Sequence, residues 1–139
     1  MRTRSAVSVG AFLVWTIFVW GIVRVRNIMG DAELTGSERT WPLVLAASLW
    51  VPAAVLLIVL VVTLIRKKPF AKAATVGVAV LGVWTTLVWM VRAFDIALVS
   101  DRELPFILVH LVLAVISVGL AVLAARALRP DPAPTPNLP

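Results

Sequence analysis

Long apolar runs alternate with short polar segments along the whole chain. Four runs, at residues 6–23, about 43–65, 73–91 and 105–125, are long enough to cross a bilayer, which requires about 20 apolar residues. None has an ionised side chain in its central part, and none alternates as a transmembrane β-strand does. Because backbone polar groups must be satisfied internally in lipid, the runs predict four membrane-spanning helices.

Two of these runs share a sequence pattern. Residues 15–20 read Trp-Thr-x-x-Val-Trp, and the same pattern recurs 69 positions later at residues 84–89. The match continues into the following residues, which are Arg24, Asn27 and Ile28 after the first copy and Arg92, Asp95 and Ile96 after the second. Residues 37–42 and 100–105 also match, at an offset of 63. The chain therefore contains an internal repeat, which determines the architecture we expect.

Each copy of the repeat, at about residues 6–68 and about 75–129, contains two spans and predicts a helical hairpin. Because two crossings return the chain to the same side, both hairpins share one orientation, unlike the inverted repeats of many transporters. We therefore expect an all-α polytopic membrane protein. Its single domain, residues 1–129, would hold four transmembrane helices as a tandem parallel repeat of two hairpins. The Pro-rich residues 130–139 predict a disordered cytoplasmic tail.

The composition supports a membrane protein and excludes several chemistries. The chain is 61% hydrophobic, whereas soluble domains are about 45–50% apolar. It contains no Cys. This excludes thiol redox chemistry, disulfide bonds and Cys-ligated metal, and with them the quinone-coupled disulfide enzymes.

The distribution of charge predicts the orientation. Eight cations and one acid, Asp131, fall in the N-terminus, the segment between the second and third runs, and the C-terminus. These cations are Arg2, Arg4, Arg66, Lys67, Lys68, Lys72, Arg126 and Arg129. The other two loops hold five cations and six acids. The positive-inside rule then places both termini in the cytoplasm, so the net charge of +6 indicates topology rather than nucleic-acid binding.

Several repeated residues cluster at the predicted outer boundary. Trp20, Trp41 and Trp89 fit an aromatic belt that anchors helices at the interface. Arg24 and Arg92 follow Trp20 and Trp89 by four and three residues, so each guanidinium shares a helix face with an indole and a cation–π contact is expected. Both arginines would also lie at helix C-termini, which favour cations. Interface anchoring and ligand binding are both open.

Two further arginines, Arg39 and Arg102, lie at predicted helix N-termini, where the helix dipole disfavours a cation. Their presence in both copies predicts partners, either nearby acids or a ligand or protein. Ser100 and Glu103 fit a capping box, while Ser37 in the first copy lacks the matching acid. Pro42 and Pro105 suit the first turns of their helices.

Three tryptophans, Trp15, Trp50 and Trp84, fall near mid-membrane, where an indole N–H requires an acceptor. A hydroxyl such as Thr16 or Thr85, or a backbone carbonyl, would serve; a pigment or quinone site is the alternative. Small residues at Ser117, Ala121 and Ala125 predict close packing of the fourth helix, and Pro52 predicts a kink beside Trp50. Aside from the quinone or pigment alternative, none of these residues suggests a bound cofactor.

The single histidine, His110, lies about a turn and a half inside the fourth span. Its counterpart at an offset of 63 is Ala47, so it stands outside the repeat. One histidine without Cys supplies neither two haem ligands nor a metal site. A hydrogen-bonded packing role and a proton or ligand role both stay open. We therefore expect no catalytic residue, no metal and no cofactor.

The run from residue 15 to 28, together with the Cys-free, Ala-, Val-, Leu- and Arg-rich composition, resembles small four-helix integral membrane proteins of high-GC Gram-positive bacteria. The resemblance implies the bacterial plasma membrane and implies no activity.

Three functions follow as hypotheses. The first is a non-enzymatic accessory or scaffold subunit, with a membrane-protein partner or a second copy of itself. The second is a small transporter or anion-binding protein using an outer cluster of Arg24, Arg39, Arg92 and Arg102. The third is an enzyme using His110 with Asp101 or Glu103.

Overall fold

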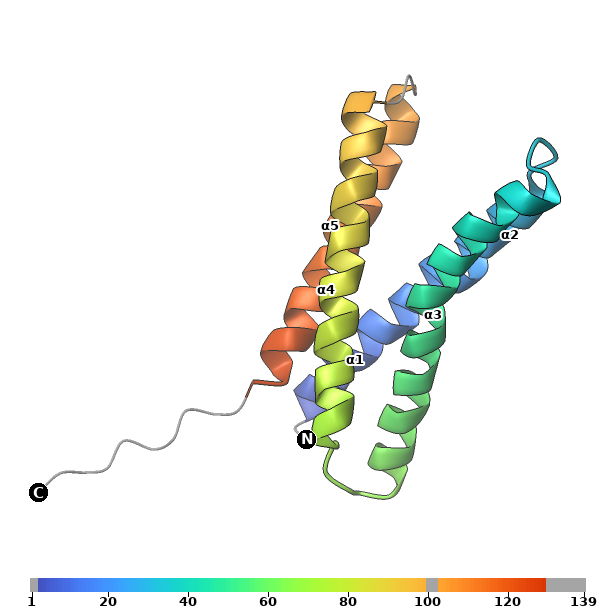
Figure 1. The fold of residues 1–139 in the computed structure, drawn as a ribbon. Coiled ribbons are helices and arrows are strands. Elements are labelled where there is room, and N and C mark those ends of the chain that lie inside the picture. Colours follow the sequence, from blue (N-terminus) through green and yellow to red (C-terminus); the bar gives the residue numbers. More distant parts are fainter. Residues whose placement is uncertain (1–2, 100–102, 130–139) are drawn as a thin grey trace, which may run out of the picture.

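The computed structural model describes residues 3–99 and 103–129, and all elements in this part of the chain are helical (Figure 1). The first rod consists of α1 (Thr3–Thr16), the π-helical η1 (Ile17–Arg24) and α2 (Val25–Gly30). It is followed by α3 (Gly36–Ile65), by α4 (Lys72–Phe94) continuing as the π-helical η2 (Asp95–Val99), and by α5 (Leu104–Ala127). The predicted tail, residues 130–139, lies outside the described residues.

Four helical rods are long and apolar enough to cross a membrane, as predicted for a multi-pass membrane protein. They are Arg4–Gly30, Gly36–Ile65, Lys72–Leu98 and Leu104–Ala127. The rods exceed the predicted spans. The first was predicted to end at Val23, but its helical backbone runs on to Gly30. Its 27 residues span about 40 Å at 1.5 Å per residue, more than the roughly 30 Å hydrocarbon core.

The rods form two pairs that meet at one end and diverge at the other (Figure 1). The first helix pair is α1, η1 and α2 with α3; the second is α4 and η2 with α5. The pairs touch near the N-terminus, where α1 packs on α5 and α3 on α4. They separate toward α2 and η2, which we call the open end.

Small side chains allow the close approach of α5 to its neighbours. Ala114, Ser117, Ala121 and Ala124 are its buried residues, at the three- and four-residue spacing of one helix face. Of the small residues predicted to pack closely, Ser117 and Ala121 are buried as expected. Ala125 is exposed, and Ala124, one position earlier, is buried in its place.

Two indole hydrogen bonds join the helix pairs. Trp15 Nε1 donates to Ser117 Oγ at 2.9 Å, and Trp84 Nε1 donates to Ser48 Oγ at 3.0 Å. Hydroxyl acceptors were predicted, but not these serines. Thr16 Oγ1 instead donates to the carbonyl of Phe12, the local bond that a helical threonine usually makes.

The Trp15–Ser117 bond predicts a stability difference between two serines. Ser117→Ala is expected to lower the free energy of unfolding by about 1 to 2 kcal/mol, because it leaves an interior indole N–H unpaired. Ser8→Ala is the control, since the Ser8 hydroxyl donates to Arg4 O in its own helix and is expected to cost almost nothing. Unfolding by SDS in mixed micelles measures both. Equal stabilities of the two variants would contradict the prediction.

The helix starts differ from those predicted. Thr35 precedes α3, and both its backbone N–H and its hydroxyl donate to Glu38 Oε2, at 2.8 and 2.6 Å. The capping box is therefore Thr35–Glu38, since Glu38 stands three residues after Thr35 and not after Ser37. In consequence Pro42 lies in the second turn of α3. Glu103 is the N-cap residue of α5 rather than the third residue of a box, and Ser100 lies outside the described residues.

Candidate functional site

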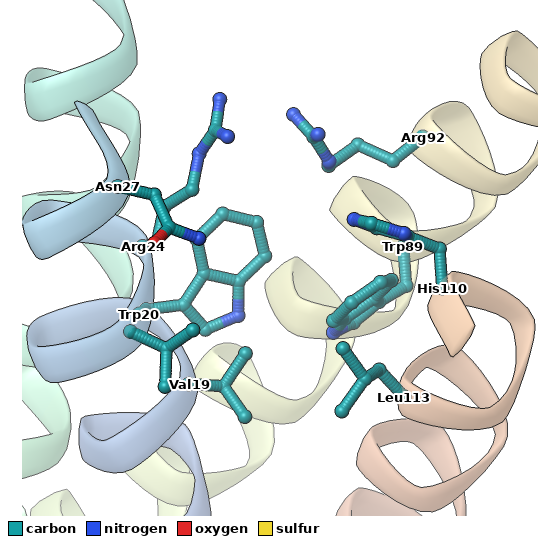
Figure 2. A pocket seen from close by; sticks show the side chains of 9 residues that line it. Val19, Trp20, Arg24, Asn27, Trp89, Arg92, His110 and Leu113 are labelled. Atoms are coloured by element: carbon teal, nitrogen blue, oxygen red, sulfur yellow. The ribbon is translucent and has the colours of Figure 1, made fainter. Parts of the chain in front are cut away.

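A cavity of about 60 Å³ lies between the helix pairs at the point where they separate (Figure 2). We call it the central cleft. Its polar and aromatic lining comes from η1, α2, α4 and α5, and consists of Trp20, Arg24, Asn27, Trp89, Arg92 and His110. Since a bound water requires about 10–15 Å³ of such volume, the cleft has room for several water molecules or one small polyatomic ion.

Two tryptophans form the base of the cleft. Trp20 and Trp89 are each 3% exposed, and their rings meet edge to face with centroids 5.7 Å apart. Neither indole N–H has a hydrogen-bond partner among the described residues. Figure 2 shows both indole nitrogens on the ring edges that face the space between the helix pairs. The base therefore offers two unused donors.

Two arginines stand at the open side of the cleft, about one turn beyond the tryptophans. Arg24 and Arg92 are half-buried, and their guanidinium groups extend toward each other from opposite helix pairs (Figure 2). The two like charges repel each other, and Arg92 is also attracted by Asp95. Partial burial of two like charges is unfavourable, and Asp95 offsets part of this cost at Arg92.

The structure corrects the predicted setting of these arginines. Arg24 was expected at a helix C-terminus, but α2 continues the helix to Gly30; Arg92 is likewise followed by η2. The helix dipole therefore does not explain either cation. The ring contact that the structure shows for Trp20 and Trp89 is with each other, across the two helix pairs.

His110 joins the cleft from α5, although the repeat did not single it out. Its Nδ1 lies 2.9 Å from the carbonyl of Phe106, and the two rings are tilted by 33° with centroids 4.0 Å apart. Because a carbonyl oxygen only accepts, Nδ1 donates to it. Figure 2 shows a ring nitrogen of His110 directed into the cleft beside Arg92.

The remaining predicted residues lie elsewhere. Arg39 Nη2 donates a hydrogen bond of 2.7 Å to the backbone carbonyl of Asp31. This bond ties α3 to the loop between α2 and α3. Trp41 is 72% exposed on the outside of α3, a position suited to interface anchoring. Arg102 and Asp101 lie outside the described residues. Of the four arginines predicted to cluster, the structure brings together Arg24 and Arg92.

Asn27 is a lining residue whose role the sequence reasoning did not recognise. It follows Arg24 by three residues, so both lie on one helix face, and this spacing was the available signal.

The chemistry of the cleft is dominated by hydrogen-bond donors. The donors that line it are two guanidinium groups, two indole N–H groups and the NH2 group of Asn27. Among the described residues, the lining includes no carboxylate, and the His110 ring and the Asn27 amide oxygen are its other polar groups. Such a set is suited to an oxyanion. No group of three His, Asp or Glu side chains that could hold a metal ion occurs in residues 3–99 and 103–129. In comparisons with known proteins, no protein family, curated protein or solved structure matches the chain.

Proposed function

We propose that this protein is an anion-binding integral membrane protein whose central cleft receives an oxyanion between Arg24 and Arg92. One observation carries the proposal. Two half-buried guanidinium groups from opposite helix pairs lie at the open side of the cleft, one turn beyond the paired tryptophans. An oxyanion bound there accepts hydrogen bonds from both guanidinium groups and offsets their repulsion.

The energetics of the cleft favour an anion over water alone. A buried donor without a partner costs about 1–3 kcal/mol, and water relieves that cost. Water weakens the repulsion between two half-buried like charges but does not remove it, whereas an anion between them does. Hydrogen bonds between guanidinium groups and an oxyanion are both charge-assisted and directional, so they contribute more than neutral ones.

The anion-binding hypothesis is thereby preferred to the scaffold hypothesis. An accessory subunit needs apolar contact faces and has no requirement for a cation pair held between its helices. The position of Glu103 does not favour the enzyme hypothesis. Glu103 precedes α5 by one position, two helical turns before His110, and does not line the cleft.

We further propose that the two helix pairs are tandem parallel repeats with both termini in the cytoplasm of a bacterial cell. The two indole hydrogen bonds support this symmetry. Trp15 and Trp84 are equivalent positions of the repeat, 69 residues apart, and each donates to a serine of the other helix pair. The two serines are not equivalent at the offset of 63 that relates α3 to α5, so the support comes from the tryptophans. The cation-rich closed end then faces inward, and the central cleft opens outward.

Titration with inorganic phosphate tests the anion site. In phosphate-free non-ionic detergent at constant ionic strength, the purified protein is expected to show a saturable change in tryptophan fluorescence, since Trp20 and Trp89 form the base of the cleft. Arg24→Gln and Arg92→Gln are each expected to weaken binding about 10- to 100-fold, the value of a charge-assisted hydrogen bond.

The matched control is Arg26→Gln, which removes the same charge from an exposed position two residues beyond Arg24. It is expected to bind phosphate as the wild type does. Because both cleft arginines act on one anion, the double variant is expected to lose less than the product of the two single losses. Wild-type affinity in both single variants would show that the cleft is not an anion site.

A further inference from the structure

A second cavity lies on the outside of the protein, on the other side of Trp89 from the central cleft. This α4–α5 groove has a volume of about 380 Å³ and an almost wholly apolar surface. Trp89, Met90, Ala93, Leu111, Ala114 and Val118 line it. Trp89 also lines the central cleft, so a single indole separates the polar and the apolar site.

The spacing of the charges places the two sites at definite depths in a bilayer. Arg4 and Arg24 are 20 residues apart on the first rod, and Lys72 and Arg92 are 20 residues apart on the third. At 1.5 Å per residue both intervals are about 30 Å, the thickness of the hydrocarbon core. Arg24 and Arg92 then lie at the level of the lipid phosphates.

The groove extends from that level toward the middle of the bilayer. On α4 it is lined by Trp89, Met90 and Ala93, which all lie within one helical turn of Arg92. On α5, which runs the opposite way, it reaches from Leu111 down to Val118. A lipid chain lying in the groove would therefore have its headgroup beside the open side of the central cleft.

We infer that the anion is the phosphate of a phospholipid with a net negative headgroup, one of whose acyl chains lies in the α4–α5 groove. This inference rests on the proposed anion site. Trp89 lines both cavities, so a phosphate in the central cleft and an acyl chain in the α4–α5 groove can belong to one lipid molecule. The positive charge of the two arginines favours an anionic headgroup. A zwitterionic lipid would bring an ammonium group toward two guanidinium groups, whereas an anionic headgroup would not.

A second groove on the same helices provides an internal comparison. It lies nearer the closed end, has a volume of about 300 Å³ and is lined by Ala79, Gly82, Val83 and Ala121 among others. No arginine or lysine lines it. It therefore accepts a chain equally well but lacks a site for a phosphate, so it should bind lipid without preference for charge.

The test measures which lipids remain bound after extraction from bilayers of equal phosphatidylglycerol and phosphatidylcholine, by native mass spectrometry. The wild type is expected to retain phosphatidylglycerol about 10-fold over phosphatidylcholine, the value of one charge-assisted contact. Arg92→Gln is expected to lose this preference. Ala93→Leu fills the α4–α5 groove and is expected to lose bound phosphatidylglycerol, while Ala79→Leu, the same change in the comparison groove, retains it.

The phosphate titration of the same variants separates this inference from the proposed function. Ala93→Leu is expected to bind inorganic phosphate as the wild type does, which also shows that it folds. If Ala93→Leu fails to fold, Val115→Trp replaces it, because Val115 lines the groove and is 73% exposed.

Three results would overturn the inference. The first is undiminished phosphatidylglycerol in the groove variants, with phosphate binding that still depends on Arg92; the site then takes a soluble anion. The second is equal retention of both lipids by the wild type. The third is phosphate and lipid binding that are both independent of Arg24 and Arg92, which would also remove the proposed function.

Discussion

Replacing Gly21 by leucine is expected to lower the free energy of unfolding by about 3 kcal/mol, the upper end of the usual cost of overpacking. A Cβ atom at Gly21 would lie 3.2 Å from Cγ and 3.3 Å from Cβ of Trp50. These atoms belong to the stem of a large ring, so they move only if the ring or the whole helix moves. The first rod and α3 therefore cannot approach this closely with a side chain at Gly21.

The control is Gly119→Leu, the same substitution in another membrane helix. No atom lies within 4 Å of a Cβ placed at Gly119, and leucine forms helix better than glycine by up to about 1 kcal/mol. This variant is expected to be as stable as the wild type or more so. Gly77→Ala should fall between them, because its Cβ lies 3.1 Å from Cδ2 of Leu56, the end of a flexible side chain.

Unfolding in mixed micelles ranks the three variants. The substitution at Gly21 is also expected to weaken phosphate binding, since Trp20 precedes Gly21 and Arg24 follows within η1. A Gly21→Leu protein with wild-type stability and wild-type affinity would show that the close approach to Trp50 positions neither the helix nor the cleft.

The four rods were predictable because lipid requires long uncharged runs, and each run is visible in the sequence. Their ends were not. The prediction stopped the first helix at Val23 because Arg24 is charged, yet helical hydrogen bonding continues through Arg26 and Asn27 to Gly30. Polar side chains in the headgroup region do not interrupt a helix. Hydropathy therefore locates the membrane boundary better than it locates the end of the backbone helix.

The residues of the cleft were mostly identifiable, but their contacts were not. Repetition singled out Trp20, Trp89, Arg24 and Arg92, which were interpreted as pairs within each helix. The structure instead pairs the tryptophans with each other and faces the arginines across two helix pairs. The spacing of residues along one helix shows which of them share a face. The angle between two helix pairs depends on how their side chains pack, and this packing could not be predicted from the sequence.

His110 shows a different limit of sequence reasoning. A repeat identifies what two halves share, so it passes over a residue that one half alone contributes. Any site on the axis between two similar halves can be lined asymmetrically, and His110 enters the central cleft in this way. The single histidine of the chain was the available signal, and its location opposite Arg24 required the fold.

Removing Arg24 is expected to stabilise the phosphate-free protein while it weakens binding. In phosphate-free buffer, Arg24→Gln should raise the free energy of unfolding by up to about 1 kcal/mol, because one of two repelling, partly exposed charges is gone. Arg92→Gln should gain less, because it also removes the attraction between Arg92 and Asp95. Arg26→Gln removes an exposed charge that does not line the cleft and is expected to leave stability unchanged.

Phosphate is expected to reverse this order. At a concentration about 100 times its Kd, a ligand adds about 2.7 kcal/mol to the stability of the protein that binds it. A variant whose affinity is at least about 10-fold lower gains about 1.4 kcal/mol or less at the same concentration. The wild type, less stable than Arg24→Gln without phosphate, should therefore become more stable than it at saturation.

The free energy of unfolding, plotted against phosphate concentration, gives one curve for the wild type and one for Arg24→Gln. If the two curves cross, the arginine belongs to a binding site and not only to the structure. Phosphate strengthens apolar packing in any protein, and Arg26→Gln measures that general effect, so the comparison is made at equal ionic strength with chloride as the reference salt. If Arg24 and Arg92 had a structural role, their loss would destabilise the protein at every phosphate concentration, and the curves would run parallel. If they hold an anion, Arg24→Gln is stabilising without phosphate and destabilising relative to the wild type with it, because the two charges that repel each other in the unliganded fold both attract the ligand.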